Sequence, residues 1–135
     1  MIEKEFIPYE LALELKQLGF NQPTFFAFDN CSHPMRCTDL RTNEQKFNGV
    51  NYNSSSYTSQ PTYSQAFRWF REKYSLATQF AYYHVPKWTF EILEFTDIKM
   101  TPSKIVCENS KPRTYEEAEL ACLKKLIEIV KQNEK

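Results

Sequence analysis

The alternation of apolar and polar positions predicts a first helix over residues 8–18. Its apolar positions recur at the helical period of about 3.6 residues and form one stripe, at Leu11, Leu15 and Leu18. Pro8 suits the first turn of a helix, and Gly19 suits the left-handed position that ends one. Tyr9 and Leu13 fall on nearly the opposite side. Two apolar faces require two partners, so either the helix is enclosed between a sheet and a loop, or Tyr9 and Leu13 contact a second copy of the chain in a homo-oligomer.

A second helix is predicted to begin at Tyr63 in the segment PTYSQAFRWFREKYSL, residues 61–76. Thr62 followed three residues later by Gln65 is a capping box, in which each side chain satisfies a backbone N–H at the helix start. On a helical projection five apolar residues form the core stripe, namely Tyr63, Ala66, Phe67, Phe70 and Tyr74. Phe70 is therefore predicted to be structural.

The outer flank of this helix combines one large ring with basic side chains. Trp69 lies about 120° from the centre of the core stripe, and Arg68 and Lys73 share the flank. Trp and Arg are enriched at interface hot spots, so Arg68, Trp69 and Lys73 form our candidate partner-binding site. The alternative is that Trp69 is covered by the tyrosine-rich segment 51–61.

A third helix is predicted over residues 115–131. Thr114 and Glu117 form a second capping box, and acidic residues suit the positive end of a helix. Apolar residues cover more than half of the circumference, which indicates that this helix packs against a sheet. Cys122 lies in that apolar arc and is predicted to be a small core residue.

Shorter runs with ring-bearing or alternating apolar residues predict the strands. They cover residues 24–28, 45–50, 78–85 and 87–95, with further strand character at 105–107. The third and fourth strands are expected to form an antiparallel hairpin. The core face of the fourth is predicted to carry Trp88, Phe90 and Ile92.

The expected fold is α+β, with an antiparallel sheet of about four strands packed against helices in the order α-β-β-α-β-β-α. The segment 51–62 is polar and lacks apolar periodicity, so it is predicted to be a mobile surface loop. A length of 135 residues favours a single domain over residues 1–135.

Composition narrows the range of functions. The chain has 11 Phe, 8 Tyr and 2 Trp, which is enough for a sizeable core. Its formal net charge is zero, so no global electric field directs it to phosphate backbones or anionic membranes. No apolar run approaches the ~20 residues of a membrane span. Because Glu3, Glu5 and Glu10 interrupt the N-terminus, a signal peptide is not expected and a cytoplasmic location is predicted.

The sequence offers no conventional catalytic motif. Its two glycines exclude both a dinucleotide fingerprint and a phosphate-binding P-loop, and neither of its two histidines begins a metalloprotease motif. We therefore predict a protein that is not an enzyme and has no cofactor. One alternative is a small zinc-binding or thiol-dependent protein using Cys31, His33 and Cys37, although a closed zinc site requires a fourth ligand.

A second alternative is a nucleic-acid-binding accessory protein. Interleaved arginines and rings in residues 68–73 have the chemistry to stack bases and hold phosphates. The neutral net charge and the neighbouring Glu72 weaken any basic patch, so nucleic acid is the less favoured partner.

Three segments are distinctive in combination, namely IPYELALELKQLGF, PTYSQAFRWFREKYSL and YEEAELACLKKLIEIVK. Together they resemble a family of small uncharacterised proteins encoded by Bacteroidetes and by their phages and prophages. The resemblance implies a cytoplasmic accessory protein of a mobile element or its host, and it implies no catalytic residue, cofactor or substrate. Together with the pattern of residues, it leads us to expect a small interaction module that binds a protein partner.

Overall fold

The structure is a computed structural model and describes residues 2–29, 36–37, 49–84, 87–95, 103–108 and 114–134. In chain order its elements are η1 (Ile2–Glu5), α1 (Tyr9–Gln17), β1 (Phe26–Asp29), β2 (Arg36–Cys37), β3 (Tyr57–Gln60), α3 (Tyr63–Tyr74), β4 (Leu76–His84), β5 (Lys87–Glu94), β6 (Ser103–Glu108) and α4 (Tyr115–Asn133). Backbone contacts divide the chain into two compact units. They are the N-terminal unit, Met1–Gln65, and the C-terminal unit, Ala66–Lys135.

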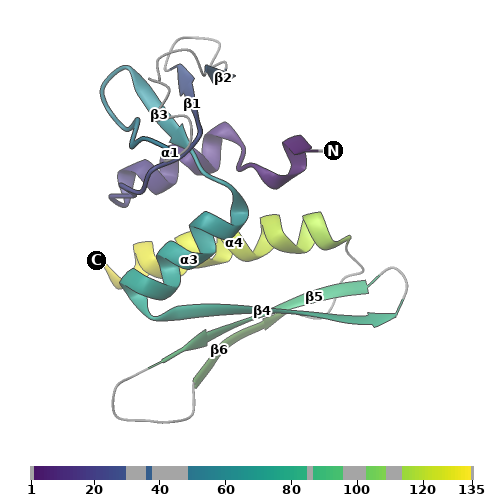
Figure 1. The fold of residues 1–135 in the computed structure, drawn as a ribbon. Coiled ribbons are helices and arrows are strands. Elements are labelled where there is room, and N and C mark those ends of the chain that lie inside the picture. Colours follow the sequence, from purple (N-terminus) through teal and green to yellow (C-terminus); the bar gives the residue numbers. More distant parts are fainter. Residues whose placement is uncertain are drawn as a thin grey trace. The chain divides into compact units, whose positions relative to one another are not determined.

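The predicted α+β class is confirmed, and so is the alternation of three α-helices with groups of antiparallel strands (Figure 1). The strands of the described ranges form two three-stranded sheets, in the orders β2-β1-β3 and β4-β5-β6. The sequence instead predicts one sheet of about four strands. Most of the predicted strand 45–50 lies outside the described residues, and Val50 makes an isolated bridge with Thr24. The single domain over residues 1–135 stays a prediction.

Helix α1 is stabilised at its C-terminal end by a left-handed glycine. Gly19 has a φ of 95°. Its N–H donates to the carbonyl of Lys16 over 3.0 Å, and the N–H of Phe20 donates to the carbonyl of Leu15 over 2.9 Å. These two bonds form a Schellman motif, which satisfies carbonyls that the helix itself leaves open. The predicted stripe is confirmed, because its three leucines are buried, at Leu11, Leu15 and Leu18.

Strand β3 corrects part of the predicted mobile loop over residues 51–62, because Tyr57–Gln60 form a strand while residues 51–56 have no regular secondary structure. It pairs along its whole length with β1 in antiparallel register. Its polar residues are buried because internal groups replace water as hydrogen-bond partners. The Gln60 amide nitrogen donates to the carbonyl of Ile7 over 3.1 Å, and the Tyr52 N–H donates to the Ser59 hydroxyl oxygen over 2.8 Å. The absence of apolar periodicity therefore does not exclude a strand here.

Helix α3 begins with the predicted capping box. The Thr62 N–H donates to Gln65 Oε1 over 2.9 Å, and the Gln65 N–H donates to Thr62 Oγ1 over 3.1 Å. Four of the five predicted stripe residues are buried, with Phe70 fully so, and Tyr74 at the end of the helix is half-buried. The boundary between the two units falls inside this helix, between Gln65 and Ala66.

The C-terminal unit consists of one sheet with helical cover. Strands β4 and β5 form the predicted antiparallel hairpin, and β6 pairs with the other edge of β5. Helix α4 packs on β5 and β4 (Figure 1). The predicted core face is confirmed, since Phe90 and Ile92 are buried and Trp88 is half-buried.

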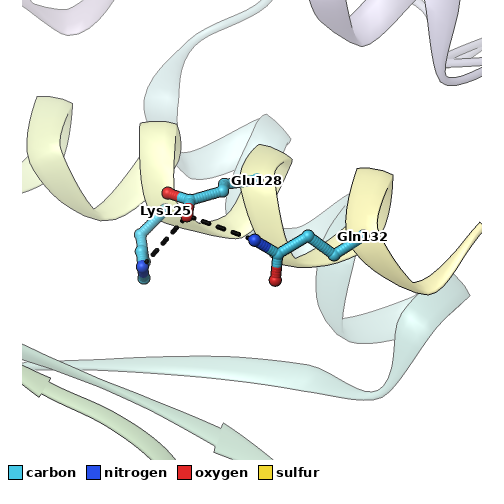
Figure 2. A network of polar contacts seen from close by, with 3 residues as sticks. All are labelled: Lys125, Glu128 and Gln132. Carbon is cyan, nitrogen blue, oxygen red and sulfur yellow. Dashed lines mark hydrogen bonds and ion pairs between the residues drawn. The ribbon is translucent and has the colours of Figure 1, made fainter.

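Helix α4 begins at its predicted cap and presents a polar outer side. The Glu117 N–H donates to Thr114 Oγ1 over 3.2 Å. On the outer side, Glu128 accepts from Lys125 Nζ over 3.3 Å and from the Gln132 amide nitrogen over 3.4 Å (Figure 2). Such exposed pairs one turn apart contribute about 0.2–0.5 kcal/mol each.

Candidate functional site

The predicted partner-binding site on α3 is not an exposed tryptophan. Trp69 is only 4% exposed, so its role as an exposed anchor is wrong, whereas cover by the segment 51–61 stays a prediction. The Trp69 ring meets the Tyr74 ring edge-on at 5.5 Å, and Lys73 Nζ lies 5.0 Å from its centroid. Arg68 and Lys73 remain exposed, so their role in partner binding stays a prediction.

The second predicted surface, on α1, is partly occupied by the chain itself. The Tyr9 ring meets the Phe28 ring of β1 edge-on at 5.3 Å. Tyr9 and Leu13 are both half-buried. This contact supports the enclosed arrangement for Tyr9, and a homo-oligomer contact through Tyr9 and Leu13 stays a prediction.

The cysteine and histidine hypothesis falls largely outside the described residues. Cys31 and His33 are not among them, and for Cys37 only the backbone pairing with Ala27 is described. The described part of the chain contains no group of three or more His, Cys, Asp or Glu residues arranged to hold a metal ion. Cys122 is fully buried, as predicted for a core residue. Zinc binding and thiol chemistry at Cys31, His33 and Cys37 stay predictions.

A different site emerges where the start of α4 lies against β4 and β5. Four rings form a continuous chain of contacts that we name the ring cluster, at Phe80, Tyr82, Trp88 and Tyr115. The Tyr82 and Trp88 centroids are 5.1 Å apart, those of Trp88 and Tyr115 are 4.9 Å apart, and those of Tyr115 and Phe80 are 5.5 Å apart. The cluster therefore joins two strands and one helix.

The ring cluster extends from the core to the surface of the C-terminal unit. At its inner end Phe80 lies 5.6 Å from the buried ring of Phe67. At its outer end Tyr82 is 48% exposed and Tyr115 is 39% exposed. The cluster is therefore anchored in packed structure while its outer rings remain in contact with solvent.

Local structure explains why these rings meet. Tyr82 and Trp88 are direct partners in the antiparallel register, so their side chains emerge on the same face of the sheet. Tyr115 is the first residue of α4, and the Thr114 cap fixes where that helix begins. The Trp88 and Tyr115 rings meet at 78°, an edge-to-face arrangement that the ring quadrupoles favour.

The sequence carries a partial signal for this site. Trp88 is on the predicted core face of its strand, and Tyr115 belongs to the predicted apolar arc of its helix. The two-residue spacing of Phe80 and Tyr82 places both on one face of β4. Sequence alone does not provide the strand register that pairs Tyr82 with Trp88. It also does not provide the packing of α4 on the strands that brings Tyr115 to these two rings.

The ring cluster has the chemistry of a contact surface. It offers aromatic faces and edges and two phenol hydroxyls, and the exposed carboxylates of Glu116 and Glu117 follow Tyr115 on α4. Aromatic faces attract cations, and carboxylates strengthen that preference. The cluster can therefore bury apolar surface and hold a basic group at its edge.

No protein-family model, curated protein or solved structure matches this chain. None of the helices in the described ranges combines the length and the apolar character that crossing a bilayer requires.

Proposed function

We propose that this chain is a small, non-enzymatic accessory protein that binds a protein partner through the ring cluster. The observation that carries the proposal is the exposure of Tyr82 and Tyr115, 48% and 39%, on two rings that each contact the ring of Trp88. Adjacent exposed large rings are uncommon on monomer surfaces and are typical of interaction sites. Trp and Tyr also dominate the residues on which binding energy depends.

The fixed geometry of the rings favours tight contact. A side chain that is already held by its neighbours loses less conformational entropy when a partner immobilises it, a saving of about 0.5–1.5 kcal/mol per side chain. Tyr82 and Tyr115 both contact Trp88, which is half-buried and cannot turn freely. The matching partner surface is apolar with a basic rim, because Glu116 and Glu117 lie beside the outer ring.

The proposed setting is the cytoplasm of a cell that carries a phage or another mobile element. The resemblance to small phage- and prophage-encoded proteins supports this setting. An accessory protein of this kind acts by occupying a surface of a larger protein, which agrees with the absence of catalytic motifs in the sequence.

The proposal is tested by removing the two outer rings together. The double variant Tyr82→Ser with Tyr115→Ser should retain the circular dichroism spectrum, because both rings are more than a third exposed. Phe25→Ser is the matched control, since Phe25 is 40% exposed in the N-terminal unit. Crosslinking in host cells and mass spectrometry identify the partner, and titration with the purified partner then measures its affinity for each variant.

We expect the double variant to bind that partner at least about tenfold more weakly, because loss of a hot-spot ring costs more than about 1 kcal/mol. Phe25→Ser should bind as the unaltered chain does. Equal affinity of the double variant and the unaltered chain would exclude the ring cluster as the interface. A partner that crosslinks only to residues near Arg68 and Lys73 would move the site to the outer flank of α3.

A further inference from the structure

The C-terminal end of α4 forms one side of a second site in the C-terminal unit. A partly enclosed pocket of about 250 Å³ opens there. Its lining comes from the end of α3, the start of β4, the end of β5 and the end of α4, at Tyr74, Leu76, Glu94, Val130, Asn133 and Glu134. This volume is below that of pockets for drug-sized molecules and suits a small ligand or a single side chain.

The turn between α3 and β4 shapes this pocket. Ser75 has a φ of 57°, a left-handed conformation that non-glycine residues adopt infrequently. Its carbonyl accepts the N–H of Phe95 over 3.0 Å, which attaches the turn to the end of β5. The turn thereby places Tyr74 and Leu76 on the pocket wall, next to Glu94, which is the register partner of Leu76. Strained backbone held by neighbouring structure is characteristic of functional sites.

The pocket has an apolar base and an acceptor-rich rim. Leu76 and Val130 are 3% and 2% exposed. At the rim, the Tyr74 hydroxyl donates to Glu134 Oε1 over 3.4 Å, and Glu94 supplies a second carboxylate. Burial, together with the charge and the hydrogen bond of Glu134, raises the pKa of the Tyr74 hydroxyl, so it stays protonated and continues to orient that carboxylate.

Three features place negative charge at the pocket, while Lys73 Nζ lies 5.3 Å from the ring of Tyr74 in its wall. Two carboxylates line it, and its lining residues include no Lys, Arg or His. Glu134 is also the C-cap residue of α4, where the last carbonyls concentrate partial negative charge. The negative charge of a carboxylate in that position is repelled by the partial negative charge of these carbonyls. A cation that lies between the carboxylate and the carbonyls attracts both and removes this penalty.

We infer that this pocket binds an alkylguanidinium group. The planar guanidinium presents five N–H donors in a fork that matches carboxylates. Glu94, Glu134 and the Asn133 side-chain oxygen supply acceptors, while Leu76 and Val130 provide an apolar surface for the methylenes that carry the group. A compact metal ion would not use that apolar base, and an ammonium would offer only three donors.

Two sources of an alkylguanidinium share this chemistry. One is a free small molecule, and the other is an arginine side chain on a protein. The pocket is separate from the ring cluster, because Tyr115 and Glu134 lie at opposite ends of α4, whose 19 residues span about 28 Å. The inference therefore goes beyond the proposed partner interface and does not depend on it.

The test is a titration of the full chain followed by NMR at the methyl groups of Leu76 and Val130. The probes are ethylguanidinium chloride, N-acetylarginine methylamide and butylammonium chloride, each compared with sodium chloride at the same ionic strength. Glu94→Gln and Glu134→Gln remove one charge each. Glu128→Gln is the matched control, because it removes the same charge from the exposed side of α4 outside the pocket (Figure 2).

We expect saturable shifts with both guanidinium probes, and each pocket variant should weaken binding about five- to tenfold, as loss of a charge-assisted hydrogen bond does. Glu128→Gln should bind as the unaltered chain does. Tighter binding of the arginine derivative supports a protein-borne side chain, and equal binding of both supports a free small molecule. Shifts that sodium chloride reproduces, equal binding of butylammonium, or pocket variants that behave as Glu128→Gln does would each overturn the inference.

Discussion

Cys122 shows how one buried residue couples folding to pH. Its side chain is fully buried in α4, and burial together with the charge of Glu119 raises the pKa of the thiol well above its ordinary value of 9.0. Both effects penalise the thiolate, since neither a low-dielectric interior nor a neighbouring carboxylate stabilises a second negative charge. The folded chain therefore retains this proton at pH values where the unfolded chain releases it.

The stability contribution of Cys122 is predicted to disappear at alkaline pH. Below pH 9.0 the thiol is protonated in both states, so its ionisation does not change the free energy of unfolding. Above that value only the unfolded chain ionises, and the free energy of unfolding falls by up to about 1.4 kcal/mol per pH unit from this group. Urea denaturation of the unaltered chain and of Cys122→Ala from pH 7 to pH 10.5 measures the effect.

Comparison of the two proteins isolates the thiol, because every other ionisable group is common to both. We expect the unaltered chain to be the more stable below pH 9.0, with the difference in unfolding free energy shrinking as the pH rises further. A difference that stays constant over the whole range would contradict a raised pKa for Cys122.

At the scale of elements, hydrogen-bonding side chains at the ends of helices were the most informative part of the sequence. Helices α3 and α4 begin where Thr62 and Thr114 predict, because a cap is a local interaction within about four residues. Helix α1 begins directly after Pro8, which makes no side-chain cap hydrogen bond. Strand β3 was missed because its stability depends on β1, which is about 30 residues away, and no local pattern records that pairing.

The distinction between local interactions and contacts of residues far apart in the sequence also explains what could be predicted of the sites. Phe70 was recognised as a core residue from its position on the helical projection alone. The same projection placed Trp69 about 120° from the core stripe and made it a candidate exposed anchor, whereas Trp69 is 4% exposed and Lys73 Nζ lies 5.0 Å from its ring centroid. The ring cluster and the pocket each combine residues from at least three elements, and their assembly depends on register and packing that local sequence does not encode.

The capping box of α3 is predicted to be a measurable source of stability. Thr62→Ala removes the oxygen that accepts the Gln65 N–H over 3.1 Å and leaves that donor without its partner. The expected cost is about 1 kcal/mol, typical of losing an N-cap side chain. Ser64→Ala is the matched control, because Ser64 is exposed in the first turn of the same helix.

Thermal or urea denaturation of both variants provides the measurement. Ser64→Ala should remain within about 0.5 kcal/mol of the unaltered chain, as exposed substitutions usually do. Equal destabilisation by the two variants would indicate that serine and threonine content near the helix start, rather than the Thr62 cap, determines the effect.

At the scale of the whole molecule, the two compact units share one helix. Residues 63–65 of α3 belong to the N-terminal unit, and the remainder of α3 belongs to the C-terminal unit. A continuous helix resists division, because each unit loses i to i+4 hydrogen bonds when the other unfolds. This continuity favours cooperative unfolding, and the single domain over residues 1–135 stays a prediction.

Cooperativity is tested by destabilising one unit and observing the other. Leu15 is fully buried in the N-terminal unit, so Leu15→Ala should cost about 2–5 kcal/mol there. The two tryptophans, Trp69 and Trp88, both belong to the C-terminal unit, so tryptophan fluorescence reports on that unit alone. Circular dichroism reports on the helices of both units.

If the chain is one cooperative domain, Leu15→Ala lowers the denaturation midpoint equally by both methods. A fluorescence midpoint that stays unchanged while part of the circular dichroism signal is lost earlier would establish two independent domains.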